Sequence, residues 1–255
     1  MIFKRAIAKL RAQDWTAIAI EICIVVIGVF IGTWVANWNQ ERQAQNQTRQ
    51  MLIQLRPELQ QLQAFSASAE RYYSITGKYA DIAMAGWRND PAVSDRDFVV
   101  AAYQASQIYG FNNNGGSWAL VFGANELRNI GDSQTRQALT RLMTFDYSNI
   151  GLGAVQTRYR DHVREVIPDS VQQQIRKQCG DVIAGPGRTV ILRATCPIEI
   201  DGALVAKTAA DLRRDRSLVP LLGQHRSVVS AYLTNLALFD TEEEALAERI
   251  NELDR

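Results

Sequence analysis

Two histidines are the residues of this chain best suited to acid–base or metal chemistry. His162 has Glu165 one helical turn after it, whereas His225 lies far along the chain. A protein metal site needs three or four ligands held close together, and one His–Glu pair does not supply them. We therefore expect both histidines to be surface or bundle residues, and the sequence predicts no metal site and no cofactor.

Serine and glycine patterns give no sign of catalysis either. A serine nucleophile often stands in a G-x-S-x-G turn, and no such turn surrounds Ser66, Ser68, Ser117 or Ser227. A phosphate-binding loop continues into Lys followed by Ser or Thr, which does not follow the glycines at 115–116. The sequence therefore predicts no catalytic residue and no enzyme activity.

Aromatic residues offer another kind of site. Trp87, Tyr103, Trp118 and Phe122 are large enough to line a ligand pocket between helices, and such pockets are mostly apolar. Aromatic residues at helical spacing more often form the core of a bundle, so we expect a core role. We expect the acidic run at 242–244 to begin a helix, where the helix dipole favours negative charge.

The strongest signal in the sequence is an apolar stretch from Trp15 to Trp38 with a single charge, Glu21. About 20 apolar residues cross a bilayer core, and tryptophans favour its two interfaces. The stretch is therefore predicted to be a transmembrane helix in contact with the lipid bilayer. A cleavable signal peptide is the alternative, but it needs a shorter apolar core and an A-x-A-like cleavage site.

Basic residues set the predicted orientation. Four of them precede the span, and the segment just after it has fewer. By the positive-inside rule the N-terminus stays in the cytoplasm, which places the rest of a bacterial inner-membrane protein in the periplasm. The predicted divisions are a cytoplasmic N-terminus at 1–14, a transmembrane helix at 15–38, and a periplasmic domain at 39–255 with a Gln-rich stalk at 39–50.

The cysteines agree with an exported domain. Cys23 lies in the predicted span, whereas Cys179 and Cys196 both lie in the exported part. Disulfides persist in oxidising compartments, so one disulfide between these two cysteines is predicted. The alternative is a pair of free buried thiols.

The ionisable side chain inside the span stands on a face of small residues. Charged groups within a bilayer are costly and usually pair or face a cavity, and a G-x-x-x-G pair lets another helix approach closely. One arc of a helix with 3.6 residues per turn contains the whole set, which is Ala17, Glu21, Gly28, Gly32 and Ala36. We expect this face to contact a membrane-protein partner or a second copy of the chain. The alternative is that the carboxyl reaches the headgroups and the glycines are incidental.

Composition narrows the class of protein. The 255 residues include 28 basic and 27 acidic ones, and no basic stripe suggests a nucleic-acid partner. Apolar residues make up 47% of the chain. The exported part is therefore long and apolar enough to bury one substantial core.

That part has the pattern of a helical bundle. Residues at alternating spacings of three and four form a seam from Leu52 to Trp87, and small or aromatic residues in its later half favour an intramolecular bundle over a long coiled coil. Pro57 is expected to kink or restart this helix because it removes a backbone donor. Residues 89–91 should end it. The seam consists of Leu52, Leu55, Leu59, Leu62, Ser66, Ala69, Tyr73, Thr76, Ala80, Ala83 and Trp87.

Capping signals and apolar spacing predict the helices that follow. Ser94 caps a helix at 97–111, Gly131 ends one at 117–130, and Asp132 or Ser133 caps a long helix that runs to Pro168. Two C-terminal segments at 208–223 and 225–239 follow. The second continues to the C-terminus, with a kink or restart near Asp240 because Thr241 and Glu244 form another capping box.

Residues 179–206 are the β candidate of the sequence. They contain β-branched runs, a Gly-Pro-Gly turn at 185–187 and an Asp-Gly pair that suggests a second turn. We predict a small hairpin or flap tied by Cys179 and Cys196. The predicted fold class is mainly α, with one N-terminal transmembrane helix continuing into a periplasmic helical bundle that carries this hairpin.

The anchor segment EICIVVIGVFIGTWVANWNQER, residues 21–42, resembles an uncharacterised family of single-span bacterial membrane proteins. The anchor of that family is roughly E-I-x-L-V-V-I-G-I-x-I-A-x-x-x-N-N-W-N-E, and Ala36 and Gln40 depart from it mildly. A second patch at 117–139 is similar to the family more loosely. The resemblance implies the single-span architecture and no particular activity.

Together these features predict a non-catalytic protein held at the membrane. We expect a membrane-anchored periplasmic accessory, scaffolding or assembly subunit of a membrane complex. The alternative is a periplasmic sensor or ligand-binding module that signals through a partner, because the predicted cytoplasmic part is too short to contain an output domain.

Overall fold

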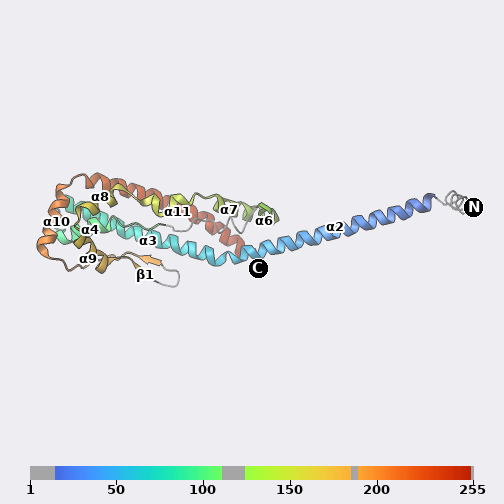
Figure 1. Cartoon of the computed structure of the whole chain (residues 1–255), viewed down its shortest axis with the longest axis horizontal. Coiled ribbons are helices and arrows are strands. Elements are labelled where there is room, and N and C mark those ends of the chain that lie inside the picture. The colour runs from blue at the N-terminus through green and yellow to red at the C-terminus, as the bar shows by residue number, and fades with distance from the viewer. Residues whose placement is uncertain (1–14, 111–123, 185–188, 254–255) are drawn as a thin grey trace, which may run out of the picture.

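The computed structural model describes residues 15–110, 124–184 and 189–253 of the chain. Figure 1 shows one long helix, α2, extending from an elongated helical bundle. The elements are α2 (Trp15–Gln54), α3 (Arg56–Trp87), α4 (Asp95–Gln104), α6 (Ala124–Asn129), α7 (Ser133–Thr144), the 3₁₀ turns η1 (Tyr147–Ile150) and η2 (Leu152–Val155), α8 (Arg158–Val166), α9 (Asp169–Cys179), strands β1 (Val182–Ala184) and β2 (Thr189–Ile191), α10 (Gly202–Arg214) and α11 (Leu218–Leu253). The predicted mainly α fold with a small hairpin is confirmed.

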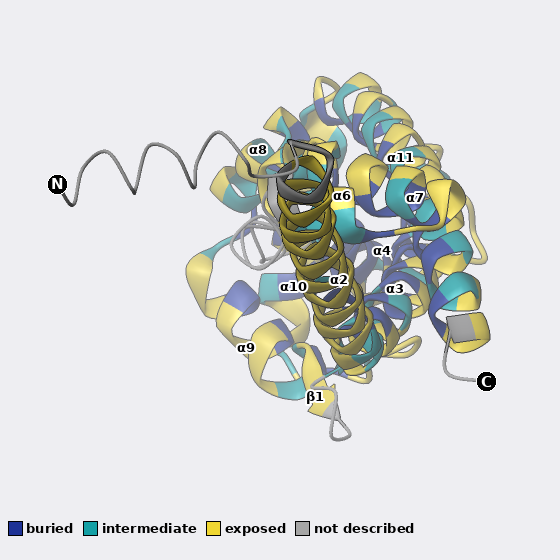
Figure 2. Ribbon diagram, turned by 90° about the vertical axis from the view of Figure 1, so that its right-hand side faces the viewer, coloured by how far each residue is buried: buried dark blue, intermediate teal, exposed yellow. Residues whose placement is uncertain are grey.

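The first part of α2 is long and apolar enough to cross a membrane. Residues 19–43 of this helix are all exposed, as the yellow of α2 in Figure 2 shows, and Figure 1 shows the helix extending away from the bundle. Farther along, Ala44 is half-buried, and Thr48 and Leu52 are buried. Thr48 and Leu52 face the α6–α7 turn, so the last turns of α2 are held against the bundle.

Pro57 divides the long helix as predicted. It lies in the first turn of α3, where its missing N–H costs little, and α2 ends at Gln54 just before it. The backbone stays helical at Leu55, so the chain continues in nearly the same direction. At the other end of α3, Asn89 adopts a left-handed conformation with φ 56°, which confirms the predicted stop.

The core lies between α3 and α11, which run antiparallel (Figure 1). Every residue of the predicted seam from Leu52 to Trp87 is buried. On α11 the matching stripe is spaced by three and four residues and consists of Tyr232, Leu236, Phe239, Glu243, Leu246 and Ile250. Three-and-four spacing on both helices explains why two long amphipathic segments pack along their length.

The predicted helix at 97–111 is shorter than expected. Ser94 caps α4 through a 3.1 Å hydrogen bond from the Asp97 backbone N–H, as predicted, but the helix ends at Gln104. Val99 and Val100 are buried, and so is Tyr103, for which a core role was expected. Trp87 packs edge-on against Phe98 of α4 at 5.2 Å between ring centroids, which joins the end of α3 to this helix.

The prediction of one long helix from 133 to 167 is wrong. Asp132 caps its start by accepting the Thr135 N–H at 2.8 Å, as expected, but α7 ends at Thr144. Asp146 then caps the short η1 turn, and Gly151 is extended, because glycine and aspartate favour caps and turns over helix interiors. Helix resumes in α8, and α9 forms in a stretch for which no element is predicted.

The hairpin is confirmed, with one change at its end. β1 and β2 pair antiparallel, with Val182 opposite Ile191. The last residues of the predicted flap belong instead to α10, because the Asp201 carboxylate accepts the Leu204 N–H at 2.9 Å and begins a helix. The glycines of the predicted turn at 185–187 lie outside the described residues.

The predicted break near Asp240 is also wrong. α11 continues without interruption from Leu218 to Leu253. The Thr241 hydroxyl donates to the Ala237 carbonyl at 2.9 Å, one turn back in the same helix, so it does not cap a new one. The acidic run at 242–244 therefore lies inside a helix and not at its start.

Candidate functional site

The predicted intramembrane face is open along the first half of α2. Glu21, Gly28, Gly32 and Ala36 are all exposed, and apart from the adjoining backbone of α2 itself no described atom lies within 4 Å of a Cβ built at either glycine. The side chain of Ala17 lies outside the described residues. The structure thus places four of the five predicted contact residues on a surface that a second helix can approach.

Helix geometry gives this face a direction. At about 100° per residue, the arc around Glu21, Gly28 and Gly32 points about 160° away from the arc of Thr48 and Leu52, which packs against the bundle. The polar residues at 39–54 that share this arc are exposed and consist of Asn39, Gln43, Asn46, Gln50 and Gln54. Asn46 also borders the groove at the α6–α7 turn. The small-residue face of α2 therefore continues into an amide-bearing face that lies mostly away from the side that contacts α6 and α7.

The predicted disulfide is present. Cys179 at the end of α9 is bonded to Cys196, with 5.4 Å between their Cα atoms. The Gln104 side-chain amide donates to the Cys179 carbonyl at 2.9 Å, and the Ser68 hydroxyl of α3 donates to the Val190 carbonyl of β2 at 3.1 Å. The disulfide and these contacts fasten the hairpin to α3 and α4, which suits an oxidising compartment.

His162 lies between two carboxyl groups at the end of the bundle far from α2. Its Nδ1 is 2.9 Å from Glu165 Oε2, and its Nε2 is 2.7 Å from Asp215 Oδ2. These hydrogen bonds, first with Glu165 and then with Asp215, raise the pKa of His162 above its ordinary value. Asp215 comes from the turn between α10 and α11, so sequence spacing gave no sign of this second partner.

Ser217 extends the same cluster in the order of a catalytic triad. Its Oγ is 3.2 Å from His162 Nε2, with Glu165 on the opposite side of the ring. A general base must be neutral to take the serine proton, whereas two carboxylates favour the cationic ring here. The Ser217 hydroxyl also donates to Asp215 Oδ1 at 2.6 Å. The cluster therefore ties α8 to the α10–α11 turn, and His162, Glu165 and Ser217 line an open depression of about 670 Å³.

His225 is a core residue, within the surface-or-bundle expectation. It is buried, and its Nδ1 is 2.8 Å from the Thr157 hydroxyl. Burial lowers the pKa of His225 to about 4, so the ring is neutral over the physiological range. The two histidines belong to separate contacts, and the described residues contain no group of three or more His, Cys, Asp or Glu that could hold a metal ion.

The other side chains singled out in the sequence mostly have structural partners. The Trp87 indole donates to the Leu212 carbonyl at 2.8 Å, and Tyr103 is buried under the Arg164 guanidinium. Ser66 is buried in the α3 seam, and Ser227 donates to the Gly223 carbonyl within α11. Gly115, Gly116, Ser117, Trp118 and Phe122 lie outside the described residues.

The acidic run on α11 separates into different roles. Glu242 accepts from Arg141 of α7 at 2.6 Å, which links two helices on the surface. Glu243 is fully buried, and neither carboxyl oxygen has a hydrogen-bond partner among the described residues. Burial, reinforced by the nearby acids Asp240 and Glu244, raises the pKa of Glu243 to about 9. The helix-start interpretation of this run is therefore wrong, and a core carboxyl stands in its place.

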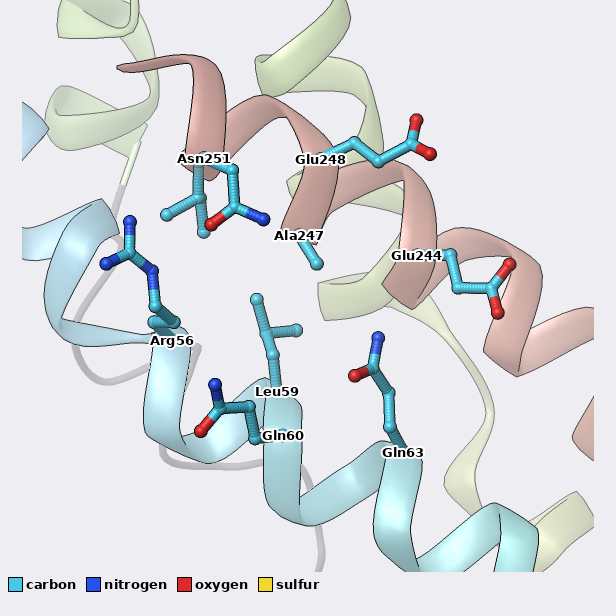
Figure 3. A pocket seen from close by; sticks show the side chains of 9 residues that line it. Arg56, Leu59, Gln60, Gln63, Glu244, Ala247, Glu248 and Asn251 are labelled. Atoms are coloured by element: carbon cyan, nitrogen blue, oxygen red, sulfur yellow. The ribbon is translucent and has the colours of Figure 1, made fainter. Parts of the chain in front are cut away.

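Two grooves open between α3 and α11. Figure 3 shows one of about 270 Å³, where Gln60 and Gln63 of α3 lie across from Glu244 and Ala247 of α11. The other, of about 180 Å³, is mostly apolar and lies beside His225. Typical small-molecule pockets measure about 300 to 1,000 Å³. Both grooves are therefore smaller than an ordinary ligand site.

Comparison of the chain with protein-family models, curated proteins and solved structures found no match. Function must therefore be argued from the residues and contacts of this chain alone. Among these, the open face of α2 is the feature for which the bundle itself supplies no partner in the described residues.

Proposed function

We propose that this protein is a non-catalytic accessory or scaffolding subunit of a complex in the bacterial inner membrane. Its N-terminus lies in the cytoplasm, α2 crosses the bilayer, and the bundle stands in the periplasm. The observation that carries the proposal is the exposed face of Glu21, Gly28, Gly32 and Ala36, which is directed away from the side of α2 that packs on the bundle. A partner helix can lie along that face without meeting the bundle.

The energetics of the bilayer support a partner at this face. An ionisable group such as Glu21 is costly inside a membrane unless it is paired. Gly28 and Gly32 allow backbones to approach closely enough for such pairing. The exposed amides of Asn39 and Gln43 extend the same face beyond the membrane, where they offer hydrogen bonds to the stalk of a partner.

Orientation and compartment have separate support. The basic residues that precede the span favour a cytoplasmic N-terminus, and the Cys179–Cys196 disulfide suits the periplasm. The resemblance of residues 21–42 to the anchors of single-span bacterial membrane proteins points to the inner membrane. A scaffold also needs little chemistry, which agrees with the cationic state favoured at His162 and the structural contacts of His225.

The test is purification of the tagged full-length protein from its native membrane in a mild detergent, with mass spectrometry and a native mass of the product. We expect a foreign subunit in fixed stoichiometry that is lost in Gly28→Ile and in Glu21→Leu. Ala19→Ile is the matched control, because Ala19 lies on the opposite side of the same span. Retention of the subunit in all three variants would refute an intramembrane contact. A lone monomer or homo-oligomer would favour the ligand-sensing alternative.

A further inference from the structure

Two arginines of α8 converge on the end of α4. Arg160 Nη1 donates to the Ser106 carbonyl at 2.6 Å, and Arg164 Nη2 donates to the Gln107 side-chain carbonyl at 3.2 Å. Gln107 also receives a longer bond from Arg160, at 3.4 Å. Arg164 stacks on the Tyr103 ring at 4.6 Å. Both side chains are half-buried, so two guanidinium groups lie side by side with limited solvent.

Their charges lack a nearby counterion. Among the described residues, no carboxylate oxygen lies within 4.0 Å of Arg160 or Arg164, whereas Arg176 beside them pairs with Asp169 at 3.2 Å. The chain from Phe98 to Asn125, which begins after the acidic first turn of α4 and includes the C-terminal part of that helix, contains no acidic residue. Burial and the neighbouring charge of Arg164 lower the pKa of Arg160, as expected for crowded cations.

The end of α4 balances only part of this charge. A helix C-terminus carries about half a negative charge, less than two guanidinium groups bring. Asp181 acts on Arg160 from beyond ion-pair distance, and its carboxylate accepts a hydrogen bond from the Tyr72 hydroxyl. Nε and Nη2 of Arg160 have no hydrogen-bond partner among the described residues. The Nε and Nη2 edge of Arg160 therefore remains available as a planar pair of donors on a cation whose charge is only partly balanced.

We propose that Arg160, backed by Arg164, binds an oxyanion through this pair of donors. A guanidinium edge matches the two oxygens of a phosphate or carboxylate group, and such charge-assisted pairs are strong. Figure 1 places α4, α8 and α9 at the end of the bundle opposite α2. The ligand is therefore a soluble molecule with a phosphate or carboxylate group, and not the headgroup of the lipid in which the chain is anchored.

The experiment measures thermal unfolding of the full-length protein in detergent with added sodium phosphate or sodium succinate, at ionic strength held constant with sodium chloride. A ligand that binds the folded state raises the midpoint in a saturable way. We expect one of the two anions to do so and Arg160→Gln to weaken its affinity about tenfold or more. Arg160→Lys keeps the charge but loses the planar pair of donors. Its anion affinity should therefore lie between those of the unaltered protein and Arg160→Gln.

Arg158→Gln is the matched control, because Arg158 is exposed on the other side of α8 and should leave anion affinity unchanged. Asp181→Asn should tighten binding, since it removes a negative charge that interacts with Arg160 and competes with the ligand. Two results would overturn the proposal. One is an absence of any shift beyond that of sodium chloride, and the other is equal anion affinity in Arg160→Gln and the unaltered protein. Calorimetric titration of folded Arg160→Lys gives the same comparison if Arg160→Gln does not fold.

Discussion

At the scale of single residues, the core carboxyl of Glu243 links stability to pH. Its pKa in the folded state is about 9, well above the ordinary value for a glutamate, because the group is buried without a partner among the described residues. The folded state therefore holds a proton that the unfolded state releases above about pH 4.5. By linkage, the stability from this group is present below that pH and is lost as the pH rises toward 9.

Glu243→Gln should remove much of this dependence. The glutamine is neutral at every pH, so the loss in unfolding midpoint between pH 5 and pH 9 should become smaller than in the unaltered protein. Glu248→Gln, an exposed change on the same helix, should leave the slope unchanged. Parallel slopes for Glu243→Gln and the unaltered protein would contradict the assignment of a buried neutral carboxyl.

His162 gives linkage of the same sign, because its pKa is also raised in the folded state. Glu165 and Asp215 raise its pKa, so the stability that its charge contributes is present below about pH 6.5 and is lost as the pH rises through the raised pKa. In a proton NMR titration, the His162 ring should titrate above the ordinary histidine value, and Glu165→Gln should move its pKa downward. A His162 ring that titrates identically in Glu165→Gln would show that the pair at 2.9 Å is not formed in solution.

Residue-scale features were predictable only where the cause is local. The Ser94 cap depends on a partner three residues away, and the disulfide joins two cysteines with a sequence separation of only 17. Asp215 and Ser217 reach His162 only because α10 and α11 bring them across from another part of the chain. A single sequence contains no signal for such a contact.

At the scale of elements, the hairpin depends on its covalent tie. Cys196→Ser opens a loop with a sequence separation of 17, which the chain-entropy estimate values at about 3 kcal/mol. The unfolding midpoint should fall clearly, and amide exchange should rise first in β1 and β2. Cys23→Ser, which removes a free cysteine, should change neither. Unaltered exchange in β1 and β2 of Cys196→Ser would mean that the contacts with α3 suffice to hold them.

Element boundaries show which signals compete. The apolar spacing from 133 to 167 predicts one helix, but Asp146 caps a 3₁₀ turn and Gly151 is extended, so the helix is interrupted there. At Asp240 the local signal is overridden instead. The capping pattern there predicts a break, but the buried stripe from Phe239 to Ile250 packs along α3 and the helix continues. Packing against α3 decides the second case, and the sequence around 240 does not contain that information.

At the scale of the whole molecule, the span, the bundle and their order along the chain were predictable because each depends on composition and spacing. The direction of the small-residue face relative to the bundle was not, because it depends on which side of α2 the α6–α7 turn occupies. That side is fixed by Thr48 and Leu52, near the end of α2. Contacts near the end of α2 therefore decide which way the small-residue face of this helix points relative to the bundle.

The arrangement of the two long helices has a mechanical consequence. α3 begins where α2 ends, and the last turn of α11 lies at that same end of the bundle (Figure 1). A force applied between the membrane anchor and the C-terminus would open α3 from α11 one turn at a time, like a zipper. A force between α2 and the turn that joins α10 to α11 would instead pull α3 and α11 past each other along their length. All of their contacts would then have to break together, so the bundle would resist this shear more strongly. We therefore expect the bundle to resist tension applied through the turn between α10 and α11, and to yield when its C-terminus is pulled.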